Sequence, residues 1–305
     1  MPLHADELPV DLPLARALVD AACPAWADLE LTPSESSGSS NALFRLGDDL
    51  VVRLPRQPGG GATIAKEAAW LPRVRDAVDV AVPEVAHLGE PGFGYPEQWA
   101  VTRWRPGARA AVPVPGATTT EGLAEDLATF IRQLRAMEMP PGATEDPELS
   151  WYRGRPLHEL DADMREAAAS CRSLDLGLDV DDVLAVWDDA TKASRDVERV
   201  TAWYHGDLLA ENLLVDDSGR LCAVLDFGGL ALGDPTVDLV VVWEALGDDG
   251  RRVLRRELDV DDATWAVSRG WAVFIALMTF PYYGTSMPAR CADRMAMAKA
   301  AVAGW

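Results

Sequence analysis

Apolar and polar residues in the first third of the chain follow several short, distinct patterns. Some stretches repeat apolar residues at helical spacing, and others are short strand-like runs bounded by turn residues such as Gly47-Asp48-Asp49. The former predict amphipathic helices and the latter predict β-strands. The predicted elements are a helix at 12–22, a hairpin of strands 42–46 and 50–54, a helix at 62–78, and strands at 82–88 and 98–104.

Helical spacing dominates the rest of the chain. A strongly amphipathic segment follows a link rich in Pro and Thr at 112–120, and its apolar face comprises Leu123, Leu127, Phe130, Ile131, Leu134 and Met137. Aromatic residues at helical spacing near 271 indicate a core helix, although they could instead line a pocket for a bulky ligand. Further helices are predicted at 157–173, 181–200, 236–247, 250–257, 262–280 and 287–303.

The composition is that of a globular protein long enough for two lobes around a cleft. The chain has 305 residues, of which 49% are apolar and 25% are charged. Its 28 basic and 49 acidic residues give a net charge of −21. Such a charge repels phosphate backbones, so we expect no nucleic acid partner. It attracts cations such as a polycationic substrate, although a role of the acidic residues in solubility explains the same excess.

Cysteine and histidine spacings do not match the common metal-binding patterns. The four cysteines, Cys23, Cys171, Cys222 and Cys291, include no Cys-x-x-Cys pair, and the four histidines have no His-x-x-x-His spacing. We therefore expect buried free thiols in a reducing cytosol and no zinc hydrolase chemistry.

The N-terminus has no basic region followed by an apolar core, so no secretory signal is predicted. The longest apolar run, residues 271–280, is too short to span a bilayer. These two observations predict a cytoplasmic protein with no membrane partner.

The most informative part of the chain is the segment 205–212, which reads His-Gly-Asp-Leu-Leu-Ala-Glu-Asn. Two short apolar runs, 213–215 and 221–225, follow it and are joined by a turn, so they predict a β-hairpin. Residues 225–228 read Leu-Asp-Phe-Gly and lie at the end of this hairpin. The hairpin would therefore return Asp226 to the neighbourhood of the first segment.

Three oxygen-bearing side chains would meet in this arrangement. Asp207 could orient a substrate hydroxyl, while Asn212 and Asp226 could hold Mg²⁺ under the phosphates of a nucleotide. Carboxylate and amide oxygens are suitable ligands for that cation. The spacing therefore favours phosphoryl transfer.

These motifs resemble the aminoglycoside phosphotransferase family, antibiotic kinases with a protein-kinase-like fold. In that family His-Gly-Asp stands where protein kinases have His-Arg-Asp, an Asn follows five residues after the Asp, and a metal-binding Asp follows a short hairpin. The block 233–239, Gly-Asp-Pro-Thr-Val-Asp-Leu, is similar to the family as well. The resemblance implies that Asp207 is catalytic and that Asn212 and Asp226 bind the metal.

The resemblance and the order of predicted elements imply an α+β, protein-kinase-like fold. A small N-terminal lobe with an antiparallel sheet and a helix, residues 1–104, would bind the nucleotide. A larger, mostly helical C-terminal lobe, residues 105–305, would carry the catalytic loop and the substrate site. The implied co-substrate is ATP or GTP, and the implied cofactor is Mg²⁺.

The resemblance assigns four residues of the first lobe to phosphate binding, three of them directly and one as a supporting partner. In the family a small-residue loop such as 34–41 lies over the triphosphate, which places Ser39 and Ser40 near the phosphate oxygens. Arg53 stands where kinases have the strand lysine, and its guanidinium would bind phosphate. Glu67, on the next predicted helix, is the candidate partner that fixes Arg53. A plain surface loop and exposed charged residues are the alternatives.

The predicted strand 98–104 leads into the hinge of the family, where backbone groups bind the base. By position, the Arg103 carbonyl and the Arg105 amide would bind the adenine or guanine edge, with Thr102 at the back of the pocket. Because this recognition is by backbone, the side chains do not distinguish ATP from GTP.

Several other polar residues are open to two interpretations. We expect His205 to brace the catalytic loop and Asp234 to have a structural role such as capping the next helix. Glu211 could face a cationic acceptor. Asp161, Asp163 and Glu166 could lie on a helix near the acceptor. The simpler interpretation is that these three residues form a solvated face of that helix.

The sequence thus predicts a small-molecule O-phosphotransferase that moves the γ-phosphate of a nucleoside triphosphate to a hydroxyl of an antibiotic, with a cationic aminoglycoside as the first choice. A macrolide or a nucleoside antibiotic is an alternative acceptor. A metabolic kinase acting on choline, homoserine or a sugar amine is an alternative enzyme. A catalytically silent nucleotide-binding protein is the non-enzymatic alternative, and the complete catalytic set argues against it.

Overall fold

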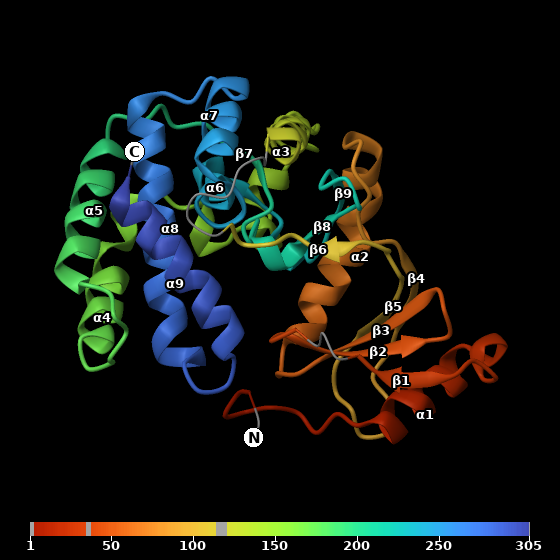
Figure 1. Ribbon diagram of the computed structural model, residues 1–305. Helices are drawn as coiled ribbons and strands as arrows, with labels where there is room; N and C mark the ends of the chain where they lie inside the picture. Colours follow the sequence, from red (N-terminus) through yellow and green to blue (C-terminus); the bar gives the residue numbers. More distant parts are fainter. Residues whose placement is uncertain (1–2, 35–37, 114–120, 305) are drawn as a thin grey trace. The chain divides into compact units, whose positions relative to one another are not determined.

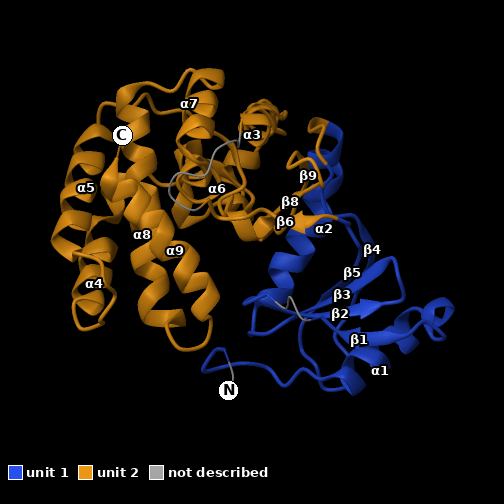
Figure 2. Cartoon of the chain, in the orientation of Figure 1, with its two compact units in different colours: residues 1–76, 81–106 blue, residues 77–80, 107–305 orange. Residues whose placement is uncertain are grey.

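The structure is a computed structural model that describes residues 3–34, 38–113 and 121–304. The chain divides into two compact units (Figure 2): unit 1 comprises residues 1–76 and 81–106, and unit 2 comprises residues 77–80 and 107–305. The predicted boundary between residues 104 and 105 lies close to the end of unit 1. Residues 35–37 of the predicted phosphate loop and 114–120 of the predicted link lie outside the described residues.

Unit 1 is built on an antiparallel sheet in the order β1-β2-β3-β5-β4 (Figure 1). The predicted hairpin is present, with Leu46 opposite Leu50 and Gly47 in the turn at φ 57°, a left-handed conformation that favours glycine. The elements of the unit are α1 (Leu12–Ala22), β1 (Leu31–Pro33), β2 (Asn41–Leu46), β3 (Leu50–Pro55), α2 (Gly60–Ala77), β4 (Val85–Gly89) and β5 (Trp99–Arg103).

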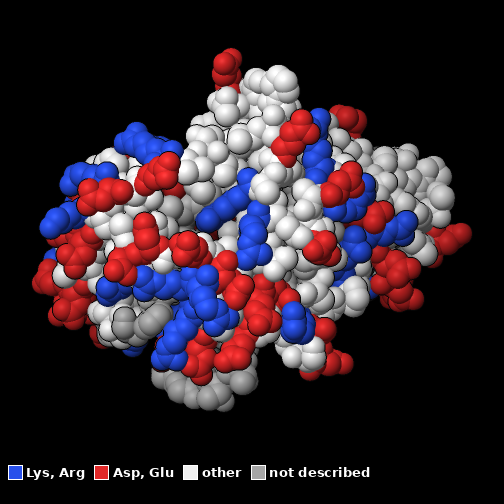
Figure 3. Space-filling model, turned by 90° about the horizontal axis from the view of Figure 1, so that it is seen from above, with Lys and Arg blue, Asp and Glu red and all other residues white. Residues whose placement is uncertain are grey.

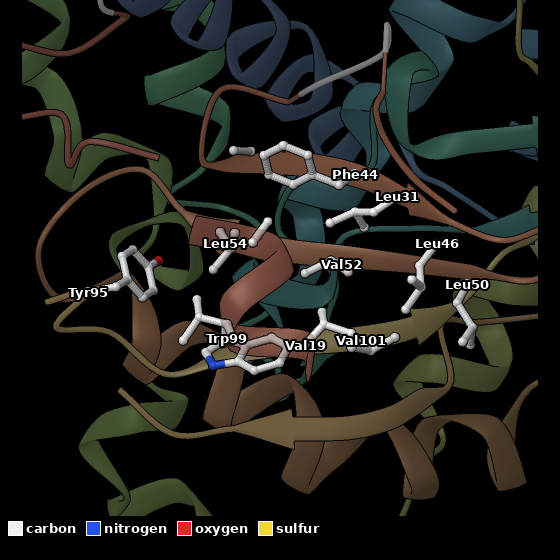
Figure 4. Close-up of a cluster of buried hydrophobic side chains, with 13 residues drawn as sticks. Val19, Leu31, Phe44, Leu46, Leu50, Val52, Leu54, Tyr95, Trp99 and Val101 are labelled. Carbon is white, nitrogen blue, oxygen red and sulfur yellow. The ribbon is translucent and has the colours of Figure 1, made fainter. Parts of the chain in front are cut away.

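The core of unit 1 lies between α1 and one face of the sheet (Figure 4). Along β2, buried residues alternate with half-buried ones, which is the period of a strand with one face in the core. Trp99 is fully buried, and its indole N–H donates to the Glu90 carbonyl at 3.0 Å. Each large apolar side chain buried here stabilises the fold by about 1.5–3 kcal/mol. This packing supports β3 from one face of the sheet.

Unit 2 contains two small antiparallel sheets, β6-β8-β9 and β10-β7. The predicted catalytic hairpin is present as β8 and β9, with Leu213 opposite Val224 and Leu214 opposite Ala223. The strands are β6 (Ala108–Arg109), β7 (Ala202–Tyr204), β8 (Leu213–Val215), β9 (Leu221–Val224) and β10 (Ala231–Gly233).

Helices make up most of unit 2 (Figure 1), as predicted. Two predicted helices start differently, because residues 157–160 and 235–240 form 3-10 turns before the α-helices begin. Proline at 156 and 235 starts each of these segments with a fixed φ and no backbone N–H. The helices are α3 (Glu121–Arg135), α4 (Asp161–Cys171), α5 (Val180–Ala193), α6 (Val241–Ala245), α7 (Asp248–Glu257), α8 (Asp262–Tyr283) and α9 (Pro288–Ala303).

Helix α8 is the central helix of unit 2. Among the described residues it is the one helix long and apolar enough to cross a membrane by length and composition, although the apolar run at 271–280 is too short on its own. However, 72% of its most apolar window is buried inside the protein. Trp265, Trp271, Phe274 and Phe280 are buried, with Phe274 stacked on Trp187 at 5.6 Å, so these four form core, whereas Tyr282 at the end of the helix is exposed.

All four cysteines are free thiols, as predicted, but they differ in burial. Cys171 is buried, and burial raises the pKa of its thiol to about 11. The other three are half-buried, which corrects the expectation that all four are buried.

Candidate active site

Two buried carboxylates hold the backbone of the segment 205–212, the catalytic loop, between β7 and β8. Asp238 accepts the backbone N–H groups of His205 and Gly206, each at 2.8 Å. Glu244 accepts the backbone N–H of Ala210, also at 2.8 Å. A buried N–H that loses its acceptor costs about 1–3 kcal/mol, so these three bonds fix the course of the loop.

Glycine at position 206 is required both by backbone conformation and by space. Gly206 has φ +82°, and a Cβ there would lie 2.7 Å from the ring of Trp151. Gly229 is confined in the same way, because a Cβ there would lie 2.8 Å from Trp151 and from the carbonyl oxygen of His205. Trp151 therefore packs against both glycines, and this packing explains why a larger residue cannot follow His205.

His205 braces the loop, as expected. Its Nδ1 accepts the backbone N–H of Asp207 at 3.2 Å, so the ring proton lies on Nε2, which donates to the Leu225 carbonyl at 3.0 Å. The ring also packs edge-on against Phe227 at 4.7 Å. The histidine thereby ties the loop to the residue preceding Asp226.

Asp207 and Asn212 are in direct contact. The Asn212 amide nitrogen donates to the backbone carbonyl of Asp207 at 2.8 Å and to its Oδ2 at 3.3 Å. Since both partners are acceptors, the orientation of the amide is determined, and its oxygen is directed to the other side. Asn212 is buried, whereas the side chain of Asp207 is 30% exposed.

The hairpin places Asp226 beside this pair. The backbone N–H of Leu225 donates to the Asn212 carbonyl at 2.8 Å, so Asp226 follows directly after a residue bonded to Asn212. Asp226 has φ +60°, a left-handed conformation that aspartate tolerates and that often marks functional sites. Its Oδ1 accepts the Gly228 N–H at 3.4 Å.

The oxygen atoms of Asn212 and Asp226 fit Mg²⁺ in chemistry. Both are hard ligands, and Mg²⁺ in nucleotide sites is commonly held by one or two side chains together with substrate phosphates. No group of three or more His, Cys, Asp or Glu residues suited to a metal occurs in the described part of the chain. A metal here would therefore depend on the two side chains and on the nucleotide.

Arg153 is the strongest electrostatic partner of Asp207. Its guanidinium donates to Asp207 Oδ1 at 2.6 Å and to the Gly206 carbonyl at 2.9 Å. Burial disfavours the charged form of Asp207, but Arg153 and Arg294 outweigh burial and hold the pKa of Asp207 below its ordinary value. The carboxylate is thus ionised at neutral pH.

In unit 1 the structure contains the predicted ion pair between Arg53 on β3 and Glu67 on α2. The Arg53 guanidinium lies 2.7 Å from Glu67 Oε2, and the side chains are 11% and 1% exposed. The sheet core and α2 therefore hold Arg53 in one place.

Ser39 and Ser40 are fixed through their backbone. The Ser39 carbonyl lies 2.8 Å from Nε2 of the buried His4, and the Ser40 carbonyl accepts the Arg56 N–H at 2.9 Å. Arg56 also pairs with Glu7 at 2.6 Å. The N-terminal segment thus supports the described end of this loop, a contact that the sequence did not predict.

The three predicted hinge residues lie at the end of β5 and just beyond it. Thr102 is buried, and the Arg103 backbone N–H donates to the Glu84 carbonyl at 2.9 Å. The Arg105 side chain donates to the Val82 carbonyl at 3.2 Å and lies 3.6 Å from Glu84. These contacts hold the chain before the change from unit 1 to unit 2.

The structure corrects the interpretation of Glu211 as a contact for a cationic acceptor. Its two carboxylate oxygens pair with Arg290 at 3.0 Å and Arg294 at 2.6 Å, both on α9. Arg294 also pairs with the buried Glu244. The charge of Glu211 is therefore balanced within the protein.

Of the remaining acidic candidates, Asp163 and Glu166 are exposed, whereas Asp161 and Asp234 have structural roles. Asp161 pairs with Arg165 at 3.2 Å and accepts the Trp187 indole N–H at 2.8 Å. Asp234 accepts the Thr236 N–H at 2.9 Å and begins the 3-10 segment, as expected.

Three residues of the site were not found from sequence. Asp238 lies inside the recognised block 233–239 but had no assigned role, and only its backbone partners reveal one. Trp151 and Arg153 lie in a stretch of short 3-10 turns that has no helical or strand period. The one available signal was the aromatic and basic cluster Trp-Tyr-Arg at 151–153.

The sheet and helix of unit 1 and the helical unit 2 with its catalytic hairpin define a kinase-like phosphotransferase. The chain belongs to the phosphotransferase enzyme family, whose model matches residues 34–271. This match confirms the family, the fold class and the enzymatic nature predicted from the sequence. No curated protein sequence matches the chain.

Solved structures with the same fold include antibiotic kinases. Wild-type aminoglycoside 2′-phosphotransferase IIIa in complex with GDP has a TM-score of 0.69 at 18% identity, covering 96% of this chain and 99% of that one. ADP-bound APH(2″)-Ib gives 0.63 at 15% identity, covering 95% and 98%. Macrolide 2′-phosphotransferase MphH from Brachybacterium faecium gives 0.61 at 21% identity, covering 96% and 98%. At these identities the likeness establishes the fold.

Proposed function

We propose that this enzyme transfers the γ-phosphate of ATP or GTP to a hydroxyl group of an antibiotic, with Mg²⁺ as cofactor. One observation carries the proposal. The Asn212 amide nitrogen is bound to Asp207, which leaves its amide oxygen for another partner, while Asp207 presents a partly exposed carboxylate. The bond from the Leu225 N–H to the Asn212 carbonyl brings the neighbouring Asp226 to this loop. An ionised hydrogen-bond acceptor would thus lie beside two side chains suited to Mg²⁺.

In the proposed reaction Asp207 accepts a hydrogen bond from the acceptor hydroxyl and aims its oxygen at the γ-phosphorus. The new O–P bond forms as the bond to the β-phosphate oxygen breaks, the hydroxyl proton passes to Asp207, and the nucleoside diphosphate leaves. Phosphoryl transfer has a loose transition state, so orientation contributes more than base strength. Mg²⁺ held by Asn212 and Asp226 would offset the charge on the leaving diphosphate.

Unit 1 would bind the nucleotide. Arg53, fixed by Glu67, offers a cation to the phosphates. The backbone at Ser39 and Ser40 would cover the phosphates. The buried Thr102 and the backbone of Arg103 and Arg105 would bind the base.

The first candidate acceptor is an aminoglycoside, because the net charge of −21 favours polycations. On the face shown in Figure 3, however, basic side chains are interspersed among acidic ones. The pairing of Glu211 with Arg290 and Arg294 favours a second candidate, a macrolide, whose recognition requires fewer free carboxylates. The net charge therefore favours an aminoglycoside, whereas the ion pairs of Glu211 favour a macrolide.

The test is a phosphorylation panel with the purified chain. Aminoglycosides, macrolides, nucleoside antibiotics, choline, homoserine and a sugar amine are each offered with Mg²⁺ and ATP or GTP. Diphosphate release and product mass are measured, with Asp207→Asn as the matched control. We expect one antibiotic class to gain a phosphate. Transfer to choline, homoserine or the sugar amine alone would replace the proposal with a metabolic kinase.

The silent alternative is tested separately by thermal unfolding. Binding of Mg²⁺ with ATP or GTP is expected to raise the unfolding temperature. If the nucleotide has no effect on that temperature and no acceptor is phosphorylated, the chain is not a kinase.

A further inference from the structure

Arg153 is held in place from several sides. Besides Asp207 Oδ1 and the Gly206 carbonyl, its Nε donates to the Tyr152 hydroxyl at 3.0 Å. The guanidinium also lies 4.7 Å from the ring centre of Trp151. Its side chain is only 15% exposed. A guanidinium with these contacts has few other orientations, so it acts as a fixed charge.

The segment that carries Arg153 is itself fastened to the catalytic loop. The Tyr204 hydroxyl, at the end of β7, donates to the Trp151 carbonyl at 3.3 Å, and the Asp234 N–H donates to the Gly154 carbonyl at 2.8 Å. A Cβ at Gly154 would lie 2.5 Å from the Tyr204 hydroxyl, so the backbone must approach closely there. The position of Arg153 is therefore set by the same elements that set the loop.

The two oxygens of Asp207 are not equivalent in this arrangement. Oδ1 accepts a short, charge-assisted bond from Arg153, whereas from the described part of the chain Oδ2 accepts the longer 3.3 Å bond of Asn212 alone. A carboxylate oxygen can accept more than one hydrogen bond, and Oδ2 retains the larger capacity. An incoming hydroxyl would therefore be accepted by Oδ2.

We propose that Arg153 is a positioning residue for phosphoryl transfer, which occupies Oδ1 of Asp207 and thereby assigns Oδ2 to the acceptor hydroxyl. This inference rests on the proposed function. Arg153 fixes the rotation of the carboxylate, and it acts on the reaction only through Asp207.

The charges around Asp207 agree with this role. Arg153 is next to it, and Arg294 on α9 is a second cation within electrostatic range. Burial opposes the charged form of Arg153, but Asp207 and Tyr152 raise its pKa, so it stays protonated at every practical pH.

The test compares Arg153→Met with Arg155→Met. Arg155 is a matched control on the same segment, because its ion pair within the described residues is with Glu159 at 3.3 Å and both side chains are exposed. For Arg153→Met we expect turnover to fall about 10- to 100-fold, as for a misplaced reacting group. The fall should lie in kcat, and the nucleotide KM should stay nearly constant. Arg153→Lys, which keeps a cationic donor near Oδ1, should restore part of the lost turnover.

Three results separate the possible failures. If the wild type phosphorylates nothing in the panel, the proposed function fails and this inference falls with it. If the wild type is active and Asp207→Asn is not, but Arg153→Met has the same turnover and nucleotide KM as Arg155→Met, only the role of Arg153 is wrong. If Arg153→Met does not fold, Arg153→Gln, which keeps a hydrogen-bond donor without the charge, decides. Wild-type turnover in that variant overturns the inference.

Discussion

The two units each contain an arginine–carboxylate pair. The distances between the charged groups are similar, but the more exposed partner is the arginine in one pair and the carboxylate in the other. Arg53 and Glu67 in unit 1 lie 2.7 Å apart, and Arg153 and Asp207 in unit 2 lie 2.6 Å apart. In unit 1 the carboxylate is the more buried partner, at 1% against 11% exposed. In unit 2 the arginine is the more buried partner, at 15% against 30%.

The difference indicates what each pair offers to a substrate. In each pair the more buried side chain orients the more exposed one. Unit 1 would therefore offer a cation to the substrate, and unit 2 would offer an anion. Phosphoryl transfer needs both, a cation for the phosphates and a carboxylate for the hydroxyl. Substitutions in the two pairs should therefore change different kinetic constants.

The largest expected effect comes from removing the presented anion. Asp207→Ala should lower turnover at least ~10²-fold, because the acceptor hydroxyl loses the group that orients it. Nucleotide affinity should be largely retained, since Arg53 and Glu67 are unchanged. Steady-state kinetics and nucleotide titration measure the two quantities. Near-normal turnover would remove Asp207 from the reaction.

The second prediction concerns the partner that orients the cation. Glu67→Gln should destabilise the chain by about 3 kcal/mol, because a nearly buried guanidinium loses its counter-charge. The KM for the nucleotide should rise about tenfold with a smaller change in kcat. Urea unfolding and kinetics check both.

The control is Asp20→Asn, which breaks the half-exposed pair with Arg16 on α1. It should change stability by less than about 0.5 kcal/mol. If Glu67→Gln behaves like this control, the ion pair does not position Arg53.

Several residues of these two sites have positions that local spacing determines, and these residues were predicted from the sequence. Asp207 and Asn212 are five residues apart on one loop, and the hairpin register then brings Asp226 to them. Glu67 was predicted from the helix after β3. In each case a short connection leaves few possible geometries.

Arg153 and Asp238 could not be found in this way. Arg153 lies 54 residues before Asp207, and Asp238 lies 33 residues after His205. Their roles depend on how separate elements pack, and no period in the sequence records that packing. The helix predicted at 157–173 begins later in the structure for a related reason. Pro156 starts a 3-10 turn, and the apolar pattern does not distinguish that turn from an α-helix.

The third prediction tests the support of the catalytic loop. Asp238→Asn leaves one oxygen for two backbone N–H groups, so one buried donor loses its acceptor. We expect a loss of about 1–3 kcal/mol in the free energy of unfolding, measured in urea. Turnover should fall more than nucleotide affinity. Wild-type stability in this variant would show that the loop is held by other contacts.

The smallest effect is the pH dependence of the pair in unit 2. The folded-state pKa of Asp207 is lowered, so the pair stabilises the fold above the ordinary aspartate value of about 3.9. This contribution is lost as the pH falls through the lowered folded-state pKa. The stability of the wild type relative to Arg153→Met should therefore shrink on acidification. Because Asp207 is partly exposed, the difference should stay below about 1 kcal/mol. A difference that grows on acidification would reverse the assigned sign.

The most direct measurement follows the phosphate itself. GTP or ATP labelled with ¹⁸O in the γ-phosphate is incubated with Mg²⁺, the enzyme and the antibiotic identified in the panel, and the product is analysed by mass spectrometry. We expect the labelled phosphate on a hydroxyl of the antibiotic, with at least ~10²-fold less product from Asp207→Ala. Equal product from the wild type and Asp207→Ala would contradict the proposed chemistry.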